Sequence, residues 1–213
     1  MTNSRIQKMV AIAMLCALAF TVAHVRIPIV AFLRYEPKDV IIMLGGFLYG
    51  PLAVVAMSVI VSTLEMFTLS DTGPWGLLMN VLSTCAFAGT ASFIYHRRRT
   101  LGGAMAGLTV GVIFTTGIMV LWNWLVVPFY LGVPRQFAVG MLVPVFIPFN
   151  LFKGTLNSVL IMLIFKPVVT ALHKSGLIEP TTVGKRSVKM KWIFMIATLI
   201  ITAVILVLTY NPN

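Results

Sequence analysis

The chain of 213 residues is 59% hydrophobic and 10% charged, with a mean hydropathy of +1.00 and a formal net charge of +11. This composition is typical of an integral membrane protein and excludes an ordinary soluble domain. The apolar runs are continuous rather than alternating, which favours membrane-spanning helices over a β-barrel. We therefore predict an all-α, polytopic membrane protein.

Seven apolar runs follow one another along the chain and predict seven helices. They cover residues 7 to about 29, 39–50, 51–69, 75–95, 101–131, 138–165 and 192–208. The second run is short and ends at Gly50-Pro51, a pair that stops one helix and starts the next. A helix of that length does not cross the bilayer by itself. The fifth and sixth runs exceed a simple span, so we expect tilt, a kink near Pro128 or ends beyond the membrane.

These runs divide the chain into three parts. Residues 1–174 form a six-helix core, and residues 192–209 form an additional C-terminal transmembrane helix. Residues 175–191 between them are rich in glycine, proline, threonine and basic residues, and we predict a cytoplasmic linker.

The distribution of basic residues predicts the orientation in the membrane. With the N-terminus in the cytoplasm, 11 of the 16 lysines and arginines lie inside, four lie outside and Lys153 lies within the sixth helix. By the positive-inside rule, we predict a multi-pass plasma-membrane protein with a cytoplasmic N-terminus and an external C-terminus. The net positive charge is then a topology signal, and no soluble basic module is present that would bind nucleic acid.

The residue pattern gives little support for catalysis. The sequence has five acidic residues, and none is spaced with a histidine or serine as nucleophilic catalysis requires. The two cysteines, Cys16 and Cys85, lie inside spans without metal-ligand spacing. We predict no catalytic residue, no metal site and no enzyme activity.

Lys153 lies in one of the most apolar stretches, directly after Phe149-Asn150-Leu151-Phe152. An ammonium at membrane depth costs about 2.5–3.5 kcal/mol on insertion scales. Asn150 is three residues earlier and therefore shares a helix face with Lys153. Both side chains are expected to bind something polar, although a lysine near a helix end can instead snorkel to the interface.

Further polar residues are placed on the outer side by the same topology. They are Glu36, Gly73, Asn80 and Asn123, the last flanked by Trp122 and Trp124. Amides between aromatic side chains suit a planar ligand rich in heteroatoms, because the rings supply contact area and the amides read ring edges. Each asparagine can instead form an interhelical hydrogen bond, and the tryptophans can belong to an interfacial belt. Because these residues converge on one leaflet, we predict a binding site near the outer surface.

The first helix carries small residues four apart, at Ala13 and Ala17 and again at Ala19 and Ala23. Such a strip allows another helix to approach closely. We predict that Ala13 and Ala17 dock a partner, and internal packing of the strip is the alternative.

Three of these segments together resemble the S components of the energy-coupling factor (ECF) vitamin transporters, most closely the riboflavin-specific branch. They are residues 32–40 (FLRYEPKDV) with residues 44–51 (LGGFLYGP), the alanine strip, and residues 148–154 (PFNLFKG) followed by Asn157-Ser158. The resemblance covers residues 6–174. The seventh helix lies beyond the six that are usual for this family.

The resemblance implies a prokaryotic membrane subunit without an ATPase of its own, surrounded by lipid. Its pocket lies near the outer surface under the loop after the first helix, and riboflavin is a transported ligand rather than a cofactor. The subunit docks through the first helix onto a transmembrane coupling subunit that carries two ABC-type ATPases. Rival readings are an S component for another vitamin, or a facilitator that works alone.

The resemblance also implies roles for the candidate residues. Asn150 and Lys153 match a pair that contacts the flavin, and Asn123 matches an amide that reads the ring. Asn80, Gly73 and Glu36 match substrate-binding positions more loosely.

Overall fold

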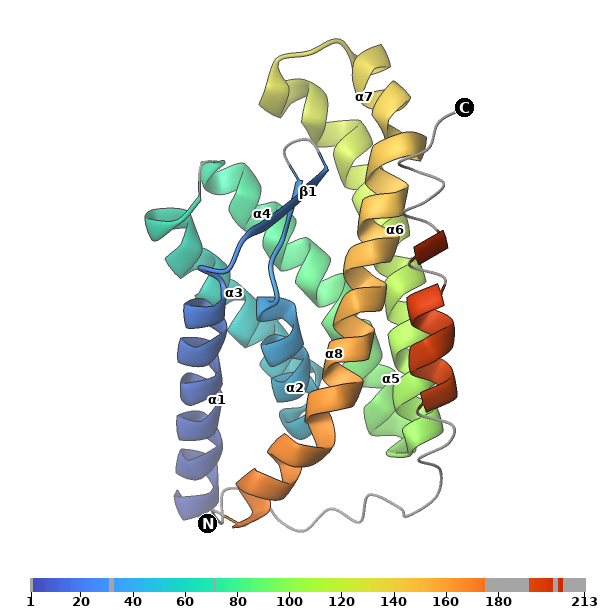
Figure 1. The fold of residues 1–213 in the computed structure, drawn as a ribbon. Coiled ribbons are helices and arrows are strands. Elements are labelled where there is room, and N and C mark those ends of the chain that lie inside the picture. Colours follow the sequence, from blue (N-terminus) through green and yellow to red (C-terminus); the bar gives the residue numbers. More distant parts are fainter. Residues whose placement is uncertain (1, 31–32, 71, 175–191, 201–202, 205–213) are drawn as a thin grey trace.

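The computed structural model describes residues 2–30, 33–70, 72–174, 192–200 and 203–204 (Figure 1). The helices of its first 174 residues are α1 (Thr2–Val22), α2 (Lys38–Tyr49), α3 (Pro51–Thr68), α4 (Gly73–Thr84), α5 (Thr90–Arg98), α6 (Leu101–Leu131), α7 (Arg135–Met141) and α8 (Ile147–Lys174). Two π-helical segments, η1 (Cys85–Gly89) and η2 (Leu142–Phe146), join α4 to α5 and α7 to α8 without a break. Two short antiparallel strands, β1 (Ile27–Val30) and β2 (Leu33–Tyr35), form a ribbon between α1 and α2.

Five helical stretches among the described residues are long and apolar enough to cross a membrane. They are Arg5–Val22, Pro51–Thr68, Gly73–Arg98, Leu101–Leu131 and Arg135–Phe165. The chain is therefore a helical, multi-pass membrane protein, as its composition predicts. The short helix α2 has 12 residues, in agreement with the expectation that the second apolar run does not span the bilayer alone.

Some predicted boundaries agree with the structure and others are wrong; the sixth run was predicted to end at residue 165, whereas α8 continues to Lys174. Helix α6 begins and ends at the predicted residues, and α2 and α3 agree to within one residue at each end. The first helix, however, ends at Val22 instead of continuing to about residue 29, and Ile27–Val30 is a strand. Pro28 disfavours a helical conformation at Ile27, and β-branched side chains favour a strand.

The predicted linker, residues 175–191, lies outside the described residues, as does part of the predicted seventh helix. The described part of that helix, residues 192–200 and 203–204, is helical. Its Met195 is buried and belongs to the main hydrophobic core.

The main hydrophobic core takes buried side chains from α1, α2, α3, α5, α6 and α8. Helix α6 packs closely against η1 and α5 because two of its glycines face backbone atoms of these segments. A β-carbon at Gly107 would lie 2.7 Å from the carbonyl oxygen of Ala91, and one at Gly111 would lie 2.8 Å from that of Phe87. Small residues of this kind are the usual means of close packing between membrane helices.

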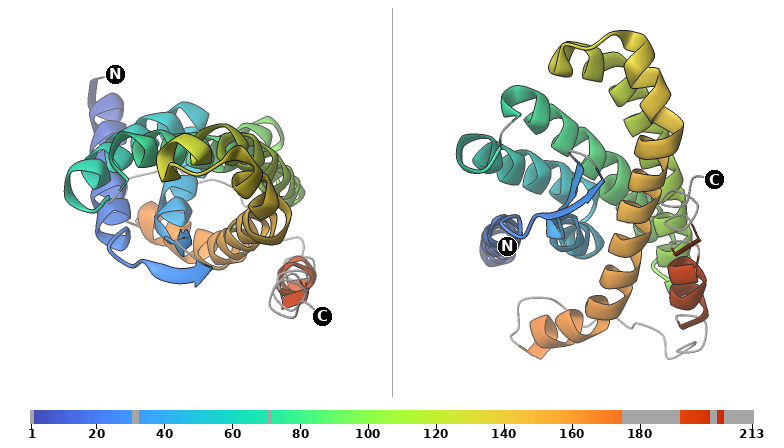
Figure 2. Two further views of the ribbon diagram at one scale, coloured as in Figure 1. Left: turned by 90° about the horizontal axis from the view of Figure 1, so that it is seen from above. Right: turned by 45° about the horizontal axis from the view of Figure 1, so that its top comes forward.

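The ribbon runs from the end of α1 to the side of α8 (Figure 2). The hydroxyl of Tyr35 in β2 donates to Oδ1 of Asn157 in α8 at 2.8 Å, and the Tyr35 ring meets Phe152 edge-on. Burial, together with the nearby charge of Asp39, raises the pKa of Tyr35, so its hydroxyl remains a neutral donor. These contacts hold β2 against α8 beside the cavity described next.

Candidate binding site

A cavity of about 320 Å³ lies between the ribbon and helices α4, α6 and α8. This volume is within the range of small-molecule sites, about 300–1,000 Å³. Aromatic side chains from three helices, Trp75, Trp122 and Phe149, line its wall together with several methionines and valines. The cavity thus combines apolar walls with a small number of polar groups, the usual composition of a ligand site.

Five of the six predicted substrate-binding residues line this cavity. They are Glu36, Asn80, Asn123, Asn150 and Lys153. The sixth, Gly73, does not line it and instead begins α4 with a φ of +53°, a conformation that glycine adopts without strain. Gly76, one turn further, lines the wall, and a β-carbon there would lie 1.9 Å from Oγ1 of Thr72.

The two buried asparagines are oriented by their own helices. Nδ2 of Asn123 donates to the carbonyl oxygen of Met119 at 2.6 Å, and Nδ2 of Asn150 donates to that of Phe146 at 2.8 Å. These bonds lie within one helix, so they are not the interhelical bonds weighed as an alternative. Each bond fixes which way the amide points, and the Oδ1 acceptor together with the second N–H remains for a ligand.

Lys153 reaches into the bundle instead of toward a helix end. Its Nζ lies 2.9 Å from Oδ2 of Asp39, and the lysine side chain is 14% exposed. The hydroxyl of Thr84 donates to Oδ1 of the same carboxylate at 2.7 Å. An ammonium has three N–H donors, so Lys153 can hold Asp39 and still donate to a ligand.

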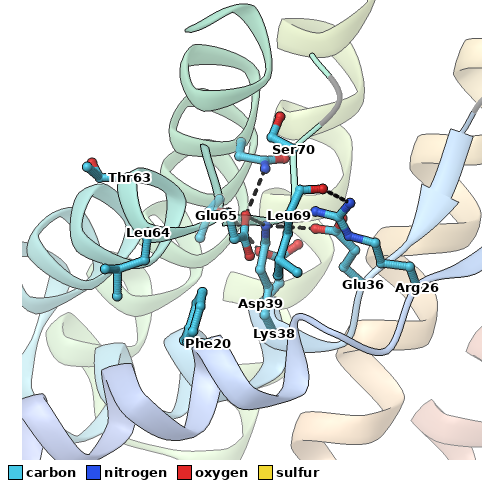
Figure 3. A network of polar contacts seen from close by, with 12 residues as sticks. Phe20, Arg26, Glu36, Lys38, Asp39, Thr63, Leu64, Glu65, Leu69 and Ser70 are labelled. Carbon is cyan, nitrogen blue, oxygen red and sulfur yellow. Dashed lines mark hydrogen bonds and ion pairs between the residues drawn. The ribbon is translucent and has the colours of Figure 1, made fainter. Parts of the chain in front are cut away.

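A second set of charges connects the ribbon to α3 (Figure 3). Nζ of the buried Lys38 binds Oε2 of Glu65 and lies 2.7 Å from Oε2 of Glu36. Nδ2 of Asn80 donates to Oε2 of Glu65 at 3.0 Å, and Nε of Arg26 lies 3.2 Å from Oε1 of Glu36. Two of the predicted site residues, Glu36 and Asn80, are therefore held in place by this set.

Six charged side chains beside the cavity form ion pairs with one another, and the cavity wall also carries Arg34. Three carboxylates are matched with three cations, namely Glu36, Asp39 and Glu65 with Arg26, Lys38 and Lys153. Pairing of this kind is what makes buried charges tolerable in a membrane protein.

Four charged residues of this region were not predicted as part of the site, namely Arg26, Arg34, Lys38 and Glu65. Glu65 is buried within the apolar stretch of α3, and the insertion cost that singled out Lys153 applies to it equally. Arg26 and Arg34 line the cavity and Lys38 is buried beside it, whereas the positive-inside rule identified all three only as external charges. The positions of Arg26 and Arg34 follow from the ribbon, which hydropathy does not predict.

Comparison with known proteins identifies the family. The family model described as "ECF transporter, substrate-specific component" matches residues 7–165. The chain belongs to this family. The predicted resemblance is confirmed, and the family is that of a transporter component.

The ECF component is similar to curated riboflavin transporters. RibU of Staphylococcus aureus (strain TCH60) is 27% identical over 179 residues, which cover 79% of this chain and 93% of RibU. FmnP of Bacillus subtilis (strain 168) is 25% identical over 173 residues, which cover 76% of this chain and 91% of FmnP. A solved structure, described as "Structure and mechanism of the S component of a bacterial ECF transporter", matches with a TM-score of 0.68 and 27% identity. It covers 79% of this chain and 98% of the solved one.

On the surface of this ECF component, the two alanine pairs of α1 face different ways. Ala13 and Ala17 are exposed, whereas Ala19 and Ala23 are fully buried. Internal packing therefore accounts for the second pair, and the first pair lies on an outer face with Met9, Met14 and Leu18.

Proposed function

We propose that this ECF component binds riboflavin in the cavity and delivers it for ATP-driven uptake. The observation that carries the proposal is the convergence of Asn123, Asn150 and Lys153 on one cavity with aromatic walls. The riboflavin transporters among its relatives support the choice of ligand.

The chemistry of the cavity suits a flavin. A flavin ring is planar and carries carbonyl oxygens and an N–H along one edge. Lys153 donates to a carbonyl oxygen, Oδ1 of one of the two asparagines, Asn123 or Asn150, accepts a hydrogen bond from the ring N–H, and the free amide N–H of the other donates to a ring carbonyl oxygen. The aromatic side chains pack on the ring faces. Glu36 and Asn80 lie on the cavity wall beside the ribbon and bind the hydroxyls of the sugar chain.

In this proposal, residues 1–174 form six helices, the C-terminal segment forms a seventh, and the N-terminus lies in the cytoplasm of a prokaryotic cell. The cavity then opens outside, where riboflavin is captured. The exposed face at Ala13 and Ala17 docks a transmembrane coupling subunit, which is driven by two ABC-type ATPases. The seventh helix is an accessory anchor whose end lies outside the cell.

Riboflavin binding to the purified protein tests the proposal. Protein purified in detergent from cells that lack riboflavin is titrated with riboflavin, and quenching of the flavin fluorescence is recorded. We expect saturable quenching, and its loss in the double variant Asn150→Ala/Lys153→Met. The matched control is Thr109→Ala, because Thr109 lies on the exposed face of α6 away from the cavity. Absence of saturable binding in the folded wild-type protein contradicts the proposal.

A further inference from the structure

Arg26 lies at the point where three segments meet. Its Nε is 3.2 Å from Oε1 of Glu36, which directly follows β2, and its Nη1 donates to the carbonyl oxygen of Leu69 (Figure 3). Leu69 is the residue that caps the C-terminal end of α3. One side chain, 17% exposed, thus connects the start of β1, the end of β2 and the end of α3.

The guanidinium is well suited to this position. The last carbonyl groups of a helix have no partner within the helix, and the helix dipole gives this end a partial negative charge. A guanidinium presents several N–H donors in a fixed planar fork, so it binds a carboxylate and a carbonyl oxygen together. A lysine ammonium is a single point charge on a flexible stem and does not reproduce this geometry.

The two strands of the ribbon are held very differently. On the β2 side, Tyr35 bonds to Asn157, Lys38 pairs with Glu65, and Asp39 pairs with Lys153. On the β1 side, among the described residues, the bond from Arg26 to Leu69 makes the polar link to a helix. The side chain of Ile27, next in the chain, is 45% exposed. Apart from its pairing with β2, the β1 side is therefore the weakly held side, and its attachment to α3 depends on Arg26.

We infer that Arg26 is a positioning residue that holds the β1 side of the ribbon and Glu36 against the end of α3, and that it thereby sets the rate at which the ligand leaves. Arg26 and Glu36 both line the cavity, as do Ser70 and Thr72 after α3, so movement of this side opens the wall between the ribbon and the segment after α3. The ring-reading residues on α6 and α8 are untouched by such a movement. This inference rests on the proposed function, and it concerns retention of the ligand rather than the choice of ligand.

Arg26→Gln tests the inference with two measurements. The first is the dissociation rate of riboflavin, followed by the recovery of its fluorescence after dilution. We expect dissociation about tenfold faster, the loss that corresponds to one charge-assisted hydrogen bond. The second is hydrogen exchange at the amides of Ile27, Ile29 and Val30 in the ligand-free protein, which we expect to accelerate. The second measurement does not depend on any contact between Arg26 and the ligand.

Two further variants complete the experiment. Arg26→Lys keeps the charge and is expected to give intermediate values for both measurements. Should Arg26→Gln not fold, Arg26→Lys carries the test. Arg135→Gln removes a charge of the same sign at a position that does not line the cavity, where Arg135 lies 5.1 Å from the Trp124 ring, and it is the matched control. Both measurements are expected to stay at wild-type values in this control.

Each remaining outcome has a definite meaning. Unchanged dissociation in Arg26→Gln overturns the inference, whether or not exchange at the β1 amides is faster. Faster dissociation with unchanged exchange also overturns it, because Arg26 then acts only through direct contact with the ligand. Absence of riboflavin binding in the wild-type protein contradicts the proposed function instead, and the exchange measurement still reports whether Arg26 holds the ribbon.

Discussion

Replacing Lys153 with methionine is expected to reduce both the stability of the fold and the affinity for riboflavin, for two separate reasons. The ammonium lies 2.9 Å from Asp39, whose side chain is 2% exposed. Removing one partner of a buried ion pair costs about 3–5 kcal/mol in the free energy of unfolding, because the other charge is left without compensation. Loss of a charge-assisted hydrogen bond to the ligand costs about 1.5–3 kcal/mol more in binding, which is about tenfold or more in affinity.

The double variant Asp39→Asn/Lys153→Met separates the two effects. It removes both charges, so no buried charge is left without a partner. Replacing a whole buried ion pair is often close to neutral for the free energy of unfolding. We expect it to recover most of the thermal stability that Lys153→Met loses in detergent, while the riboflavin affinity stays low. Thermal unfolding measures the first quantity and quenching of riboflavin fluorescence the second.

The result that would refute this reasoning is a Lys153→Met protein that unfolds at the wild-type temperature and binds riboflavin with wild-type affinity. Lys153 would then reach water in the folded protein. A double variant that is no more stable than the single one refutes the ion-pair part alone.

Three further predictions concern other parts of the fold. Ala13→Trp is expected to leave riboflavin affinity unchanged, since Ala13 is exposed and does not line the cavity, and to abolish riboflavin uptake by cells that contain the coupling subunits. Loss of affinity as well would show that this face of α1 packs internally. Gly107→Ala is expected to destabilise the protein by about 1–3 kcal/mol in thermal unfolding, because its new methyl group would lie 2.7 Å from the Ala91 carbonyl oxygen. Gly117→Ala is the control and is expected to cost nothing, because its methyl group would meet no neighbouring atom of the described residues within 4 Å. Equal stability of the two variants would contradict this prediction. Truncation after Lys174 is expected to leave riboflavin affinity unchanged in titrations, because all the described residues that line the cavity precede it. A large change in affinity would give the C-terminal helix a part in binding.

The helices could be predicted well wherever an apolar run was bounded by residues that stop a helix. Helix α6 follows Thr100, which caps its first turn, and ends at Gly132, which has a φ of +63°. The pair Gly50-Pro51 likewise separates α2 from α3. In such places the local sequence alone determines the boundary.

The ribbon escaped prediction because hydropathy does not distinguish an apolar strand from the end of an apolar helix. Ile27–Val30 continues the apolar run of α1, and only Pro28 and the β-branched side chains indicate a change of structure. The pairing of Ile27 with Tyr35 is a contact between segments, so no single run of sequence encodes it.

The candidate site was predictable for the residues whose cost in a membrane is obvious. Lys153 and its neighbour Asn150 were found in this way, and the same argument would have found Glu65. What could not be predicted is the pairing, because Lys38 meets Glu65 and Lys153 meets Asp39 only after three helices have packed together. The sequence showed that charges lie at membrane depth without showing which ones neutralise each other.

The ion pairs beside the cavity also have a consequence for how the chain is made. Glu36, Lys38 and Glu65 lie close together in the sequence, so they can neutralise one another as soon as α2 and α3 have entered the membrane. Asp39 has its cationic partner on α8, which leaves the ribosome much later. Until then its carboxylate must stay at the water interface or take up a proton, since an unpaired charge in the bilayer costs kilocalories per mole. Arrival of α8 therefore completes the binding site and the ion pair of Asp39 in one step. A nascent chain cannot bury Asp39 as part of this ion pair before Lys153 has reached the cavity.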